Sequence, residues 1–321
     1  MKPTTIKFIL QKLQSDIPIM LLQVVYSDGS SPGRQGFQMA IANDGQLSGS
    51  IGGGIMEHKL VEFSKKKLSE KETTVELKYQ YHDKIHSSQQ SGMICSGHQV
   101  IAFFPFYKQD IELFQKIDQS IEFSKSEYLY FTQKGLSILS KHELTIPLGF
   151  HQNEINTDWS YLEKVNQQKI IHIFGGGHVS LALSEVMHFL GFYIKIYDDR
   201  EGVNTLQQNI FCHEKHIISY DSIASQLENC QDDYVVIMTF GYRPDKIVLK
   251  QLLGKDFFYI GMMGSKAKIK TLLAELEKEG FSKASYEHVF TPIGLEIFSK
   301  TPQEIAISVA AEIIRESNRV R

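Results

Sequence analysis

The stretch KIIHIFGGGHVSLALSEVMHFLGFYIKIYDD, residues 169–199, decides the fold of the second half of the chain. It begins with KIIHIF, a short apolar run that is typical of a buried strand. Three glycines follow and lead into the helix-like segment HVSLALSEVMHFLG, after which FYIKIYDD has the pattern of a second strand. This order predicts two parallel strands joined by a crossover helix.

The glycines of this stretch stand where a strand ends and a helix begins. Gly175-x-Gly177-x-x-Ser180 is a dinucleotide-type fingerprint with serine at the third position. Gly175 permits a tight turn, and Gly177 permits a phosphate to approach the helix N-terminus, where His178 also lies. Asp198, at the end of the next strand, can accept a hydrogen bond from a ribose hydroxyl. The glycines either hold a dinucleotide or only allow the strand and helix to pack closely.

The same alternation continues toward the C-terminus. DDYVVIMTF and DFFYIGMMG are strand patterns, and helices are expected from about Asp245 to Leu253 and over KAKIKTLLAELEKEG. Residues 169–321 are therefore predicted to form a Rossmann-like, doubly wound parallel sheet. Ser265 opens one of these helices, where it either helps to hold an anion or acts as an ordinary cap. Thr301 and Glu304 predict a capping box for the last helix.

Residues 1–168 have a different pattern, which predicts a mixed α+β domain. A helix is expected from about Thr4 to Gln14, followed by the buried strand IPIMLLQVVYSD and the hairpin FQMAIANDGQLSGSIG. TTVELKYQYH and HQVIAFFPFY are further strand patterns. The signal weakens from about Phe106, and the polar stretch 151–168 is expected to be a surface linker between the two domains.

Two features of the first half indicate a ligand. The triple glycine Gly52-Gly53-Gly54 precedes a helix that carries Glu57, and so few side chains allow a ligand or another backbone to come close. Cys95 lies between glycines in SGMICSGHQV, where an exposed thiolate can be a soft metal ligand. The alternatives are a flexible connection for the glycines and a small buried side chain for the cysteine.

Composition excludes several classes of function. The net charge of −3 gives no general field that attracts nucleic acid or anionic lipid. No apolar run reaches transmembrane length, and the N-terminus lacks the pattern of a signal peptide. The three cysteines, Cys95, Cys212 and Cys230, are far apart and odd in number, which favours a reducing, cytoplasmic location over a disulfide framework.

The motifs, taken in order, resemble one family, the XdhC/CoxI proteins or xanthine dehydrogenase accessory factors. The resemblance covers most of the chain and rests on an ordered set of five segments. They are GSSPGRQGFQMAIANDGQLSGSIGGGIMEHKLVE, GMICSGHQVIAFF, IFGGGHVSLALSEVMHFLGFYIKIYDDR, IGMMGSKAK and PIGLEIFSKTPQEIAISVAAEII.

The resemblance implies a cytoplasmic accessory protein that binds molybdenum cofactor, supports its sulfuration and delivers it to a molybdenum hydroxylase. It implies a cofactor chaperone without catalytic activity, with a xanthine dehydrogenase-like client, a cysteine desulfurase as a second candidate partner, and a homodimer as a candidate assembly. Cys95 would contact the metal, in a site enclosed by the two domains. The cofactor-binding residues that it implies are Gly52, Gly53, Gly54, Glu57, Cys95, Gly175, Gly177, His178, Asp198 and Ser265.

This chain departs from the family pattern at two places. The family's Cys-Gly-Gly reads Cys95-Ser96-Gly97, and its usual Thr-His after the fourth Rossmann strand reads Thr239-Phe240. Two alternative functions stay open at this point. The Rossmann half is also compatible with an NAD(P)-dependent oxidoreductase or with a nucleotide-binding regulatory protein.

Overall fold

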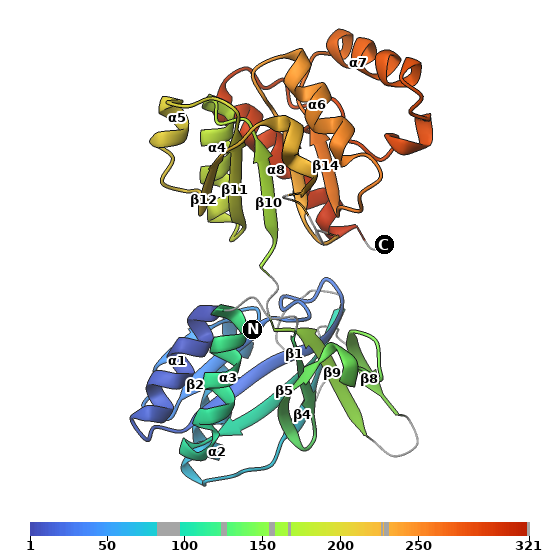
Figure 1. Ribbon diagram of the computed structural model, residues 1–321. Helices are drawn as coiled ribbons and strands as arrows, with labels where there is room; N and C mark the ends of the chain where they lie inside the picture. The colour runs from blue at the N-terminus through green and yellow to red at the C-terminus, as the bar shows by residue number, and fades with distance from the viewer. Residues whose placement is uncertain are drawn as a thin grey trace. The chain divides into compact units, whose positions relative to one another are not determined.

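A computed structural model of the chain describes residues 1–81, 97–122, 127–153, 158–165, 168–225, 227 and 231–319. The chain separates into two compact units, Met1–Gln167 and Gln168–Arg321, and the described strands of each unit pair only with strands of the same unit (Figure 1). No helix among the described residues is long and apolar enough to cross a membrane.

An antiparallel sheet forms the centre of the first unit, with five strands among the described residues in the order β3-β2-β1-β5-β4. The apolar run predicted as a strand is β1, which pairs with β2 on one side and β5 on the other. The predicted hairpin is β2–β3, so this part of the prediction is confirmed. The elements are α1 (Pro3–Gln14), β1 (Ile19–Gly29), β2 (Gln38–Ala42), β3 (Leu47–Gly49), α2 (Gly54–Ser69), β4 (Glu76–Tyr81) and β5 (Gly97–Phe106).

A second antiparallel sheet, ordered β7-β6-β9-β8, corrects the expectation of a polar linker. The stretch 151–168 supplies β9, whose side chains Trp159, Tyr161 and Leu162 are buried. The polar residues of this stretch hid a strand in which four of the six residues are buried. The elements are α3 (Ile111–Glu122), β6 (Glu127–Thr132), β7 (Gly135–Ser140), β8 (Gly149–Gln152) and β9 (Trp159–Lys164), with short 3₁₀ helices η1 (Lys108–Asp110) and η2 (Lys141–Glu143).

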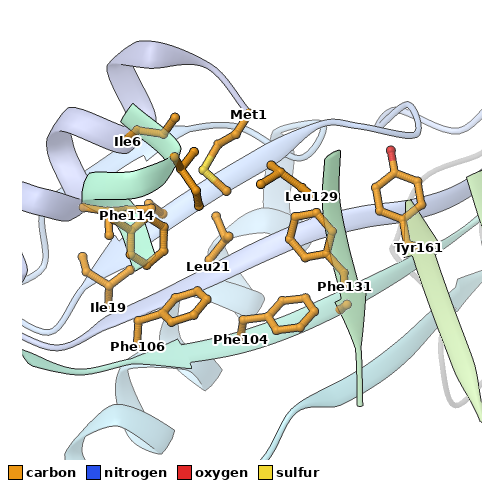
Figure 2. Close-up of a cluster of buried hydrophobic side chains, with 14 of the residues drawn as sticks. Met1, Ile6, Ile19, Leu21, Phe104, Phe106, Phe114, Leu129, Phe131 and Tyr161 are labelled. Atoms are coloured by element: carbon orange, nitrogen blue, oxygen red, sulfur yellow. The ribbon is translucent and has the colours of Figure 1, made fainter. Parts of the chain in front are cut away.

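The two sheets share one hydrophobic core, shown in Figure 2. Side chains of α1, α3 and one face of the first sheet meet side chains of β6 and β9 there. Helix α2 packs against the opposite face of the first sheet, in a separate cluster. The labelled members of the shared core are Met1, Ile6, Ile19, Leu21, Phe104, Phe106, Phe114, Leu129, Phe131 and Tyr161.

The second unit is built on a parallel sheet with the order β12-β11-β10-β13-β14. All four neighbouring pairs in this sheet are parallel, as the alternation of strands and helices predicted, and the fold class is confirmed. The elements are β10 (Ile170–Phe174), α4 (His178–Phe189), β11 (Tyr193–Asp198), α5 (Asn204–Gln207), β12 (Glu214–Ile217), η3 (Tyr220–Ser225), β13 (Tyr234–Ile237), α6 (Tyr242–Leu252), β14 (Tyr259–Met262), α7 (Lys266–Lys278), η4 (Lys283–Ser285) and α8 (Pro302–Asn318).

Helices cover both faces of this sheet. Apolar side chains of α4 and α8 pack in a cluster with one face, and those of α6 and α7 pack in a cluster with the other. The predicted capping box of α8 is present, with Thr301 accepting from the Glu304 amide. Helix α6 begins at Tyr242, three residues before the expected start at Asp245.

The buried position of β9 can be tested through Leu162, which lies in the middle of that strand. We expect Leu162→Ala to lower the free energy of unfolding by about 2–5 kcal/mol, because it removes a buried side chain and leaves a cavity. Trp159, the single tryptophan of the chain, lies in the same strand, so its fluorescence during urea unfolding reports on this unit.

Leu148→Ala is the matched control, because Leu148 is 51% exposed. We expect it to change stability by less than about 0.5 kcal/mol. Equal urea midpoints for the two variants would contradict a buried β9.

Candidate functional site

The glycine turn after β10 needs glycine at two positions for reasons of packing alone. Gly175 has a φ of +109°, and a Cβ at this position would overlap the Met238 carbonyl oxygen. A Cβ on Gly176 would lie 2.8 Å from the Leu206 Cβ. These two glycines therefore let the turn pass close to neighbouring chain segments. This agrees with the interpretation that the glycines allow close packing.

Gly177 differs from its two neighbours. Its φ of −77° suits any residue, and a Cβ here would meet no atom within 4 Å in the described structure. Packing therefore does not explain this glycine. It leaves open space at the N-terminus of α4, where no side chain of a described residue caps the first amides and His178 is exposed. Free amides at a helix start, together with the helix dipole, favour an anion.

Asp198 makes its described hydrogen bonds within the protein. Its side chain is fully buried, and Oδ2 accepts from the Gly176 amide at 2.7 Å. Arg200 donates Nε to Oδ1 at 2.9 Å and Nη2 to Oδ2 at 2.8 Å, and its amide also donates to Oδ1. The carboxylate thus ties the glycine turn to the next loop, and its oxygens are already in use for bonds within the protein.

The ionisation of Asp198 follows from these contacts. Burial by itself raises the pKa of the carboxyl, but the bonds from the Arg200 side chain, the Gly176 amide and the Arg200 amide outweigh burial. The net result is a pKa below its usual value, so Asp198 is a carboxylate at neutral pH.

Ser265 acts as a helix cap, which is one of the two roles expected for it. Its side chain accepts from the Lys268 amide at 3.2 Å, which makes it the N-cap of α7. The Lys268 ammonium donates to the buried carboxylate of Asp245, which also accepts from the Thr239 amide at 3.0 Å. These contacts join the loops after β13 and β14, and they use the lysine charge internally.

Two side chains at the carboxyl edge of the parallel sheet were not among the predicted site residues. Arg200 follows β11 and Phe240 follows β13, and the guanidinium carbon lies 5.3 Å from the centre of the phenyl ring. The signal for Arg200 was present in the sequence, because an acid two residues earlier at a strand end can fix an arginine. Phe240 had been noted only as a departure from a family pattern.

The triple glycine of the first unit is packed on one side and open on the other. Gly52 has a φ of +128°, and a Cβ here would lie 2.7 Å from the Gly33 amide nitrogen. Gly53 and Gly54 also have positive φ values, of 76° and 77°. A Cβ on Gly53 would meet nothing within 4 Å in the described structure.

Glu57 fills the role that a bound anion would have in this loop. Its Oε2 accepts from the Ser50 hydroxyl at 2.7 Å, the Ile51 amide at 2.9 Å and the Gly53 amide at 3.0 Å. The carboxylate stands in the first turn of α2, where the helix dipole also favours it. A ligand or another backbone was expected to come close here, and two of the loop amides already bind the protein's own carboxylate.

Gln99 holds the neighbouring loop in place from within β5. It is fully buried, and its Oε1 accepts from the Ser31 hydroxyl at 2.9 Å and the Gly33 amide at 3.1 Å. Its Nε2 donates to the Gln80 side chain at 3.1 Å. Sequence patterns gave no signal for this residue, because an isolated glutamine in an apolar strand is compatible with many contacts.

The cysteine prediction falls outside the described structure. Cys95 and Cys230 are not among the described residues. Cys212 is half-buried, and burial raises the pKa of its thiol, so it is poorly suited to be a thiolate ligand. The described residues contain no group of three or more His, Cys, Asp or Glu side chains arranged to hold a metal ion.

Each of the two units contains a segment that matches a protein-family model. Residues 13–80 match the XdhC and CoxI family, and residues 171–313 match the XdhC Rossmann domain. The chain belongs to the XdhC and CoxI family. The resemblance inferred from the ordered motifs is thereby confirmed.

Two proteins are similar to this chain over nearly its whole length. A Bacillus subtilis protein, whose name describes it as a probable subunit of xanthine dehydrogenase, is 22% identical over 96% of both chains. An uncharacterized Escherichia coli protein, YqeB, is 24% identical over 95% of this chain. The chain spans only 44% of the length of that second relative.

The fold also resembles a solved structure. A crystal structure from Bacillus halodurans, described as a xanthine dehydrogenase, superimposes with a TM-score of 0.75. It covers 100% of this chain and 97% of its own, with 22% sequence identity. At this level of identity the likeness shows a common fold.

The internal role of Glu57 can be tested by hydrogen exchange. We expect Glu57→Ala to speed exchange of the Ile51 and Gly53 amides by about tenfold or more, since a hydrogen bond to a charged group contributes about 1.5–3 kcal/mol. Glu62→Ala is the control, because Glu62 lies on the same helix and pairs only with Lys65 among the described residues. Unchanged exchange in Glu57→Ala would show that the carboxylate does not hold the loop.

The role of Asp198 predicts a pH dependence. A folded pKa below the unfolded value of 3.8 means that the carboxylate stabilises the fold above pH 3.8, and that this stabilisation is lost as the pH falls through the folded pKa. We expect Asp198→Asn to cost about 1.5–3 kcal/mol at neutral pH and less below pH 3.8.

Urea unfolding of the wild type and the variant across this pH range measures the difference. Asp199→Asn is the control, because Asp199 is exposed and we expect its substitution to have little effect. A stability difference that does not change with pH would contradict a charged Asp198.

Proposed function

We propose that this protein binds molybdenum cofactor and supports its maturation and insertion into a molybdenum hydroxylase of the xanthine dehydrogenase type. Membership of the XdhC and CoxI family in both units carries the proposal. The name of the Bacillus subtilis relative describes a component of xanthine dehydrogenase, and we infer an association with such a system for this chain. The cofactor is the cargo of the protein, so we propose an accessory role without catalysis.

The described residues offer one place that fits the phosphate of the cofactor. The first turn of α4 has uncapped amides beside Gly177, and the space there is open. A phosphate at this position would gain hydrogen bonds and the favourable end of the helix dipole. His178 is exposed in the same turn and is a candidate contact.

The glycine loop of the first unit fits a phosphate less well. Glu57 occupies the Ile51 and Gly53 amides, and its charge repels an anion. We therefore assign Gly52, Gly53 and Gly54 to contacts with an uncharged part of the cargo. Glu57 holds the loop in shape.

Cys95 remains a proposed contact to the metal end of the cargo. The proposal rests on the resemblance of SGMICSGHQV to the cysteine motif of the family. A thiolate is a soft ligand, which suits a metal that is already bound by sulfur. A cysteine desulfurase is the partner that would supply sulfur for sulfuration.

The test is anaerobic purification from cells that make the cofactor, followed by molybdenum and pterin analysis. We expect molybdenum and pterin to co-purify in equal amounts and to transfer to an apo-hydroxylase. Protein without either component, from cells that contain both, would overturn the proposal.

Cys95→Ala tests the proposed metal contact. We expect it to weaken retention of molybdenum by at least about tenfold, the smaller end of what loss of a supporting contact costs a metal site. Cys212→Ala is the matched control, since Cys212 is half-buried and its thiol has a raised pKa. Circular dichroism checks that both variants fold. Equal retention in the two variants would remove Cys95 from the site.

A further inference from the structure

The edge strand β12 is attached to β11 by a side chain as well as by backbone hydrogen bonds (Figure 1). His213, the residue before β12, donates its amide to the Ile194 carbonyl oxygen at 2.9 Å. The Ile194 amide in turn donates to Nδ1 of the His213 imidazole at 3.0 Å. The imidazole therefore takes the place of a backbone carbonyl at the beginning of the pairing. Because β12 has four residues and pairs only with β11 in the described structure, this bond is a substantial part of its attachment.

The bond from Ile194 fixes the protonation state of the imidazole. A backbone amide can only donate, so Nδ1 of His213 holds a lone pair and the neutral ring carries its proton on Nε2. A charged imidazole has a proton on both nitrogens and accepts no hydrogen bond. Protonation of His213 therefore directs two N–H groups at each other and breaks the bond to β11.

The groups that face His213 act on its ionisation in opposite directions. From α4, the His188 ring lies 5.6 Å away between ring centres, and from the start of β11 the Tyr193 ring stacks at 4.3 Å. From β12, the Glu214 carboxylate favours the charged imidazole, but it is also paired with Lys195 of β11 at 3.1 Å. Partial loss of hydration and the nearby His188 outweigh Glu214, and the pKa of His213 lies below its ordinary value of 6.5.

His216 of the same strand is arranged differently. Its Nε2 lies 2.8 Å from a carboxylate oxygen of Glu214. A carboxylate accepts a hydrogen bond from the neutral or the charged imidazole. Acid therefore leaves this contact in place, and the sensitivity of β12 to acid is expected at its beginning, where His213 is bonded to Ile194.

We propose that the His213 imidazole is a pH-sensitive switch of the edge strand β12: its neutral form holds the strand on β11, and its protonated form releases the beginning of the strand. His213 is exposed, so it responds directly to the pH of the solution. Because its folded pKa lies below the unfolded value of 6.5, the attachment is complete above pH 6.5 and is lost as the pH falls through the folded pKa.

Amide hydrogen exchange of the full-length protein, followed by NMR, tests the proposal. Protection factors are corrected for the effect of pH on the intrinsic exchange rate. We expect the protection factor of the Ile194 amide to fall about fivefold between about pH 7.5 and pH 5, as for the loss of one hydrogen bond. The Met238 amide, which donates to the Phe174 carbonyl oxygen, is the internal reference and should keep its protection.

Two variants separate His213 from the other titrating groups. His213→Asn keeps a neutral acceptor, because the asparagine side-chain oxygen takes the position of Nδ1 and does not titrate. We expect this variant to protect the Ile194 amide equally at both pH values. His216→Asn is the matched control from the same strand, and it should show the same fall in Ile194 protection as the wild type.

The proposal is overturned if Ile194 protection does not change with pH, or if His213→Asn loses it as the wild type does. An equal fall at Ile194 and Met238 also overturns it, because it would show unfolding of the whole sheet and no local release of β12. These outcomes do not depend on the proposed accessory role, since the exchange experiment contains neither molybdenum nor pterin.

Discussion

The carboxylate of Asp198 is the interaction on which the carboxyl edge of the parallel sheet depends. It joins two parts of the chain: the glycine turn, through the Gly176 amide, and the loop after β11, through the amide and the side chain of Arg200. The turn sets where α4 begins, and the fixed guanidinium sets where Phe240 finds its partner. The start of α4 and the position of the Arg200 side chain therefore both rely on one buried, ionised side chain.

The alternation of strands and helices in residues 169–321 was legible because β10, β13 and β14 are short apolar runs and α4 and α7 follow glycine-rich turns. The secondary structure between about Phe106 and residue 168 could not be assigned from the sequence pattern. Helix α3 carries only a few apolar residues among polar ones, and β9 contains charged residues as well as buried Trp159 and Leu162. Strands of this kind are fixed by pairing with other strands, here β6 and β8, and the pattern of the strand itself does not contain this pairing.

The site shows a similar boundary between what the sequence reveals and what it does not. Glycine-rich turns were located correctly, but the purpose of each glycine was not visible. Gly175 must be glycine because a Cβ would overlap the Met238 backbone, whereas Gly177 has free space beside it. The sequence alone does not distinguish these two glycines. Likewise, an acidic residue near a glycine loop can serve a ligand or the loop itself. Glu57 and Asp198 both serve the loop.

The carboxylate of Glu57 has a consequence for what the first unit can recognise. It is tethered to the loop it fills, so its effective concentration at the Ile51 and Gly53 amides is about millimolar or higher. A free phosphate or carboxylate from the surroundings must compete with this built-in occupant and also meets its negative charge. The loop therefore disfavours the binding of small anions and favours a neutral polar group as a ligand.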